Sequence, residues 1–199
     1  NYIAEKLKNG MKKFIILLFC SAVIFFTTAQ LLKNVISVNT IFNDSLNRIV
    51  NAYLNNYRHI QGKIFQEQSD VDIYYSTQSV PGASEALIYR FHSVEDSTAS
   101  WQAVMYNGDN YKEAAKVYKN TYRLVNKSRL NFGSGKAGSF NGTYTGPTED
   151  LRFTSSILYT QEESGPYQYF IANIDLLNNF GNWEVRLSLN KKKDDREKY

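Results

Sequence analysis

The chain has 199 residues, one cysteine and a formal net charge of +4, and its 43% hydrophobic content is enough for one folded core. With one cysteine, the fold cannot depend on intramolecular disulfide bonds. Residues 1–29 hold four lysines against one glutamate, so they contribute +3 and leave the rest of the chain near +1. A charge this close to zero gives no support to nucleic-acid binding.

Residues 11–29 have the three-part layout of a secretory signal peptide. Two lysines precede an apolar run from Phe14 to Phe26, within the range of about 7 to 15 residues typical of such a segment. Small residues at positions 27 and 29 match the cleavage pattern, so we expect cleavage before Gln30. The sequence therefore predicts export to the periplasm or the cell surface, with no membrane span left after processing.

Two other interpretations of this segment stay open. The first is an uncleaved N-terminal anchor, although the apolar run is shorter than the roughly 20 residues that a membrane span needs. The second is a lipid anchor on Cys20, although Phe19 precedes it where a small residue is preferred. Residues 1–10 precede Met11, and we expect them to come from an over-extended reading frame.

An internal similarity at an offset of 65 residues follows the leader. Apolar residues recur at helical spacing from Leu46 to Ile60, and again from Tyr111 to Val125. Polar residues that can cap a helix precede each stretch, at 43–45 and at 109–110. The pairs that are identical at this offset are Asp44 and Asp109, Tyr53 and Tyr118, Asn55 and Asn120, Tyr57 and Tyr122, and Arg58 and Arg123.

This similarity predicts a duplicated helix-plus-strands unit within one domain, residues 30–199. The two halves would span about 43–107 and 108–190, and a charged C-terminal tail would follow them. The alternative is a chance similarity between two amphipathic helices.

Strand patterns, rich in aromatic and β-branched residues, follow each predicted helix. We predict strands near 71–77, 86–92, 100–106, 138–144, 151–160, 167–176 and 183–189, with a Gly-rich link at 133–138. Short turns between neighbouring strands favour antiparallel pairing. Each helix has one apolar stripe, so the predicted fold class is α+β, an antiparallel sheet with two helices packed on one face.

Four short motifs resemble small secreted proteins of unknown function from Gram-negative bacteria. They are Tyr-Arg-His-Ile-Gln-Gly-Lys at 57–63, Ile-Tyr-Tyr-Ser at 73–76, Val-Pro-Gly-Ala at 80–83 and Trp-Gln-Ala-Val at 101–104. The resemblance covers about residues 43–130. It implies an exported α+β domain and supplies no active-site residues.

The motifs that support catalysis or cofactor binding do not occur in this sequence. The stretch Gly133–Lys136 lacks the preceding Gly and the following Ser or Thr of a phosphate-binding loop. Only His59 and His92 could act as imidazole bases or ligands, so after removal of the leader with Cys20 a zinc site would need carboxylates to complete it, and no His-Glu-x-x-His spacing occurs. We therefore predict no catalytic residue, no cofactor and no metal site.

Aromatic residues supply the candidate binding surface. They favour interfaces with proteins, peptides and sugars, and several lie in predicted strands. The candidates are Tyr74, Tyr75, Trp101, Tyr167, Tyr169 and Trp183. The predicted function is a non-enzymatic binding module with an unknown protein, peptide or glycan ligand, and an inhibitor or immunity protein for a toxin belongs to the same class.

The alternative function is hydrolysis of an envelope polymer. Glycoside hydrolysis needs two carboxyl groups about 5 to 10 Å apart. Glu149 with Asp150, and Glu162 with Glu163, are the pairs that could supply them.

Overall fold

The computed structural model describes residues 39–92, 98–132, 136–162 and 164–192. The chain divides into two units, Asn1–Thr40 and Ile41–Tyr199, and the second unit contains the sheet. The predicted leader, residues 133–135 of the Gly-rich link and the tail from 193 onward lie outside the described residues. Across the described ranges, no helix combines the length and the apolar character that crossing a membrane requires.

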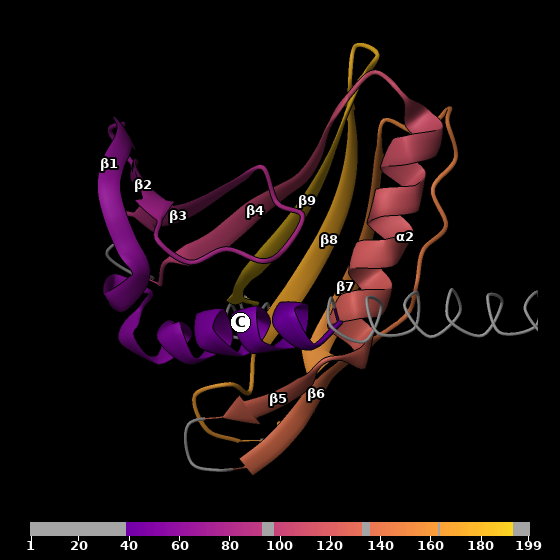
Figure 1. The fold of residues 1–199 in the computed structure, drawn as a ribbon. Coiled ribbons are helices and arrows are strands. Elements are labelled where there is room, and N and C mark those ends of the chain that lie inside the picture. The colour runs from indigo at the N-terminus through magenta and orange to yellow at the C-terminus, as the bar shows by residue number, and fades with distance from the viewer. Residues whose placement is uncertain (1–38, 93–97, 133–135, 163, 193–199) are drawn as a thin grey trace, which may run out of the picture. The chain divides into compact units, whose positions relative to one another are not determined.

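The described strands form one antiparallel sheet in the order β1-β2-β3-β4-β9-β8-β7-β6-β5 (Figure 1). The first helix covers residues 41–52 of this unit, and α2 spans Tyr111–Lys127 between β4 and β5. The strands are β1 (Gln61–Glu67), β2 (Val71–Ser76), β3 (Glu85–Phe91), β4 (Ser100–Gly108), β5 (Arg129–Phe132), β6 (Lys136–Gly142), β7 (Phe153–Thr160), β8 (Phe170–Asn179) and β9 (Asn182–Lys191). The predicted antiparallel sheet with two helices is confirmed, and strands dominate the structure.

Both helices pack on the same face of this sheet. In the strand register, Trp101 of β4 lies opposite Leu189 of β9, and Leu189 lies opposite Ala172 of β8. Ala172 in turn lies opposite Leu158 of β7, so the four residues form one row. All four side chains are fully buried, in one core with the apolar stripes of the two helices. We call this the inner face. Because side chains alternate along a strand, the residues between them point to the opposite, outer face.

The helix α2 begins and packs as its sequence predicts. The Asn110 side chain caps it by accepting a hydrogen bond from the backbone N–H of Glu113 at 3.2 Å. Ala114, Tyr118 and Val125 are buried at helical spacing, and the helix contacts β8, β9, β4 and β6.

The first helix ends earlier than predicted. Its apolar stripe was expected to run from Leu46 to Ile60, but the α-helix ends at residue 52 and gives way to two 3₁₀ turns, η1 (Tyr53–Asn55) and η2 (Arg58–Ile60). Residues 43–45, the expected cap, lie inside the helix. Those two expectations were wrong.

Tertiary contacts end this helix at two residues with left-handed backbone, Asn56 (φ 53°) and Tyr57 (φ 57°). The Asn56 side chain accepts a hydrogen bond from the backbone N–H of Ala99 at 2.6 Å. The buried Tyr57 hydroxyl donates to the carbonyl of Leu189 at 3.0 Å. These contacts offset a backbone conformation that costs about 1 to 3 kcal/mol for a residue other than glycine.

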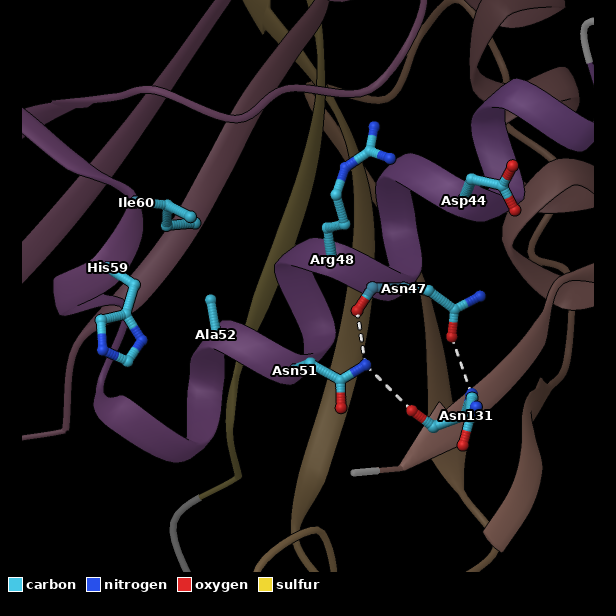
Figure 2. Close-up of a pocket in the computed structure, with 8 residues that line it drawn as sticks. All are labelled: Asp44, Asn47, Arg48, Asn51, Ala52, His59, Ile60 and Asn131. Atoms are coloured by element: carbon cyan, nitrogen blue, oxygen red, sulfur yellow. Dashed lines mark hydrogen bonds between the residues drawn. The ribbon is translucent and has the colours of Figure 1, made fainter. Parts of the chain in front are cut away.

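The first helix also closes one edge of the sheet, through three asparagines spaced four residues apart. Asn43 accepts from the backbone N–H of Arg129, and Asn47 donates to the carbonyl of the same residue, both at 2.8 Å. Asn47 accepts from the N–H of Asn131 at 2.7 Å, and Asn51 donates to its carbonyl at 2.9 Å (Figure 2). We call these contacts the asparagine ladder. Side-chain amides take the place of a neighbouring strand along β5, which would otherwise expose an unpaired edge.

We expect Asn47→Ala to lower the free energy of unfolding by about 1 to 3 kcal/mol. The variant loses two hydrogen bonds to β5, each worth roughly 0.5 to 1.5 kcal/mol. Asn120→Ala, at an exposed position of α2, is the matched control because it makes the same change in helix propensity. Denaturant unfolding of both variants measures the difference, and equal effects would contradict the role of the ladder.

Candidate functional site

The outer face carries a row of side chains that is apolar at its ends and polar in its middle. In register across six strands, the row consists of Tyr75, Leu87, Gln102, Ser188, Asn173 and Ile157. Asn190 lies two residues from Ser188 on β9, on the same face. We call Gln102, Ser188, Asn173 and Asn190 the polar belt.

Exposed apolar side chains flank the polar belt on both sides. Each is between 38% and 57% exposed, and they are Phe65, Tyr75 and Phe91 on β1 to β3, and Phe153, Ile157 and Tyr159 on β7. The rings of Phe65 and Tyr75 meet edge to face, with centroids 5.1 Å apart. Among the described residues both helices lie on the inner face, so these side chains have no helix over them. Exposed aromatic groups beside polar ones are typical of ligand-binding surfaces.

Charged residues lie beside the belt in the next row. Register aligns Arg186 of β9 with Asp175 of β8, and Asp175 with Ser155 of β7. Arg186 Nε donates to Glu184 Oε1, and this hydrogen bond raises the pKa of the arginine. Burial raises the pKa of the Asp175 carboxyl, while the hydrogen bond from Ser155 and the charge of Arg186 partly oppose that shift. The outer face therefore holds a partly desolvated acid next to an ion pair.

Two acceptors of the polar belt have no partner. The side-chain oxygens Oδ1 of Asn173 and Asn190 are buried and make no hydrogen bond within the described residues. Buried polar atoms are nearly always hydrogen-bonded in folded proteins. The polar belt therefore holds two acceptor atoms without a donor among the described residues.

The structure places three of the six predicted site residues on the inner face. Trp101 is fully buried, and Trp183 is buried against Tyr111 with ring centroids 4.9 Å apart. Tyr74 is half-buried, packs against the core and pairs with Ile88 on the inner side. These rings stabilise the core beneath the helices.

The other three candidates lie in separate places. Tyr75 is on the outer face, and Tyr167 is buried in the turn before β8, which begins at Phe170 rather than at residue 167. Tyr169 lines an open hollow of about 460 Å³ together with Tyr53 and Lys191. The six residues do not form one surface, and of them only Tyr75 lies beside the polar belt.

A second hollow, of about 590 Å³, lies between the first helix, η2 and β5 (Figure 2). Its asparagines, Asn47, Asn51 and Asn131, belong to the asparagine ladder, and Arg48 is bonded to Gln78 Oε1 at 3.2 Å. The polar groups of this hollow therefore hold the helix to the sheet.

The carboxylates that the sequence suggested for hydrolysis lie at the two ends of β7. Glu149 and Asp150 precede β7, while Glu162 follows it, and an eight-residue strand spans more than about 20 Å. Glu163 lies outside the described residues. Glu149 or Asp150 therefore cannot act with Glu162 on one bond, while Glu149 and Asp150 themselves are an exposed pair in the turn before β7.

The histidines are surface groups. His59 is exposed in η2, and exposed His92 contacts Asp72 through Nε2 at 3.0 Å. Within the described ranges, no three His, Cys, Asp or Glu side chains group as they would around a metal ion.

No protein-family model, curated protein or solved structure matches this chain. The function therefore has to be argued from the geometry of the outer face.

Asp175 gives a pH-dependent prediction. Its pKa is raised in the folded state, so its contribution to stability is present below the ordinary value of about 3.9 and is lost as the pH rises through the folded pKa. Asp175→Asn should therefore become more stable relative to the unmodified chain as the pH rises from about 3 to 7. Denaturant unfolding across this range measures the difference.

Asp150→Asn is the control of opposite sign. A hydrogen bond from Thr148 lowers the pKa of Asp150, so its contribution is present at neutral pH and is lost on acidification. A change in the same direction for both variants would contradict this assignment.

Proposed function

We propose that this chain is an exported, non-enzymatic binding module of the periplasm or cell surface, and that its ligand binds across the outer face. The observation that supports this most is the polar belt between two exposed apolar flanks, on the face that neither helix covers. The ligand class is a protein segment, a peptide or a glycan.

The dimensions of this face fit an extended ligand. Adjacent strands lie about 4.8 Å apart, so the row from β2 to β7 is about 24 Å long. A fully extended peptide of about seven residues covers that length. Amide and hydroxyl groups of the belt would bond the polar groups of the ligand, while Tyr75 and Ile157 would contact its apolar parts at either end.

Export rests on the leader. The apolar segment at 11–29 and its two lysines are typical of secretory signals, and the remaining chain is close to neutral. A sheet face for an extracellular ligand agrees with that location.

We also propose that the two halves arose by duplication. The first helix precedes β1 to β4, α2 precedes β5 to β9, and β4 and β9 are neighbours at the centre of the sheet. The 65-residue offset aligns only residues 46–52 with α2 as helix, because the first helix ends there. The support for duplication is therefore the order of elements and the identities in the sequence.

Variants of the two flanks test the proposed function. Tyr75→Ala and Ile157→Ala should each weaken binding about tenfold in screens against envelope glycans and extended peptides, since each removes a contact worth roughly 1 to 2 kcal/mol. Phe180→Ala is the matched control, because this ring is 99% exposed in the β8–β9 turn, away from the belt. The same affinity for the ligand in all three variants, or no binding of the chain to any glycan or peptide, would contradict the proposal.

Hydrolysis of an envelope polymer is the second candidate. The observation in its favour concerns Asp175 and Glu184, a pair that the sequence did not suggest. These two carboxylates lie on the outer face on neighbouring strands, and the pKa of Asp175 is raised. Incubation with the bound polymer separates the two functions. Shortened products that disappear with Asp175→Asn would favour hydrolysis, whereas an unchanged polymer favours binding.

A further inference from the structure

The hairpin of β1 and β2 forms one edge of the sheet and has little support from the core. It joins the other strands through the pairing of β2 with β3, and residues 63–67 of β1 are exposed (Figure 1). Two register shifts interrupt the ladder between β1 and β2. Elements with few buried apolar contacts open locally at a low cost in free energy. Polar contacts at the turn of this hairpin therefore affect how often it opens.

Three contacts from His92, which follows β3, converge on the turn between β1 and β2. Its backbone N–H donates to the carbonyl of Asp70 at 2.9 Å. In its ring, Nδ1 lies 3.2 Å from the carbonyl oxygen of Ser69, and Nε2 lies 3.0 Å from Asp72 Oδ2. One residue thus holds this turn to the end of β3.

The two ring contacts define the protonation state of His92. A backbone carbonyl and an ionised carboxylate accept hydrogen bonds and donate none, so each ring nitrogen must carry a proton to bond its partner. Only the imidazolium form has two N–H groups. After loss of one proton, a nitrogen lone pair faces an oxygen, and one of the two hydrogen bonds is lost.

We propose that His92 is a pH-sensitive clip, which holds the β1–β2 hairpin to the end of β3 while its ring is protonated and loosens the hairpin when the proton leaves. The clip is argued from the hairpin alone and does not need the proposed function. If that function holds, the clip also affects one flank of the outer face, because Phe65 and Tyr75 belong to this hairpin.

The charges at this end of the hairpin are mostly negative. Asp72 of β2 lies opposite Glu67 of β1, and Asp70 is in the turn between them. Like charges on neighbouring strands destabilise their pairing. The imidazolium of His92 brings a positive charge to this group of carboxylates, so loss of its proton removes an attraction as well as a hydrogen bond.

Two further polar side chains face Asp72, from β3 and from β2. Arg90 lies opposite Asp72 in the register, but its guanidinium donates to Gln61 Oε1 and to the carbonyl of Asn56, each at 2.7 Å. The hydroxyl of Tyr74 lies 3.5 Å from Asp72 Oδ2, beyond the usual length of a hydrogen bond. Among the described residues, the ion pair of Asp72 is therefore the one with the imidazolium.

These contacts set the pH range of the clip. The hydrogen bond with Asp72, and then the one with the Ser69 carbonyl, raise the pKa of His92 above the ordinary value of about 6.5. A group whose pKa is higher in the folded state stabilises that state below its unfolded pKa. The clip is therefore fully effective below about pH 6.5 and loses its effect as the pH rises through the folded pKa of His92.

Amide hydrogen exchange of the natively processed chain, followed by NMR from about pH 6 to 9, tests the clip. After correction for the intrinsic exchange rate, protection of the amides in residues 61–76 should fall about two- to fivefold as the ring loses its proton, the range typical of exposed ion pairs. Amides of β8 and β9 should keep their protection. In His92→Gln, whose side chain carries no charge, hairpin protection should be low at pH 6 and constant across the range.

Two further variants separate the clip from other causes of a pH response. Asp72→Asn should lower the pKa of His92 in an NMR titration of the ring, and should move the loss of protection to lower pH. His59→Gln is the matched control and should leave the response unchanged, because His59 is exposed in η2 and is the other histidine of the chain. A His92 ring that titrates at or below about pH 6.5, hairpin protection that does not change with pH, or a response that persists in His92→Gln would overturn the clip.

Discussion

Side chains on the central strands alternate between the buried inner face under the helices and the outer face, and the rest of the structure depends on this alternation. Along β4, β9 and β8, every second residue enters the core with both helices, while its neighbours point to the outer face. Burial of that face supplies most of the hydrophobic free energy of the fold, while Ile73, Leu87 and Ile171 are buried on the outer face. The outer side chains do not have to pack against a helix. Amides, carboxylates and exposed aromatic rings can therefore occupy that face.

The first helix is held by polar contacts as well as apolar ones. Its asparagine ladder runs along β5, and the left-handed pair Asn56 and Tyr57 ends it over β9. Together these contacts fix how the helix lies on the inner face and where it stops. They also make the two edges unequal, because the helix closes β5 while, among the described residues, β1 at the other end of the sheet pairs with β2 alone (Figure 1).

The chemistry of the outer face supports the proposed role in recognition. The belt of amides and a hydroxyl can bond many polar ligands, and the flanks on β1 to β3 and on β7 add apolar contacts. Arg186 neutralises part of the charge around Asp175 and Glu184, which reduces the cost of holding two carboxylates on one face. A broad sheet surface of this kind would suit the extended ligand proposed above.

Much of the fold follows from local patterns in the chain, and the candidate site does not. Apolar spacing and the Asn110 cap were enough to predict α2, and short turns between aromatic-rich segments were enough to predict antiparallel strands. Those patterns missed β1, whose residues are mostly exposed, and β5, which has four residues. They also extended the first helix past residue 52, because the hydrogen bonds of Asn56 and Tyr57 join segments more than 40 residues apart. A period of two in the sequence shows that strand residues alternate between the two faces of the sheet. Which face is buried is decided only when the helices pack against one of them. That is why Trp101 and Trp183 lie in the core while Asn173 and Ser188 lie on the open surface.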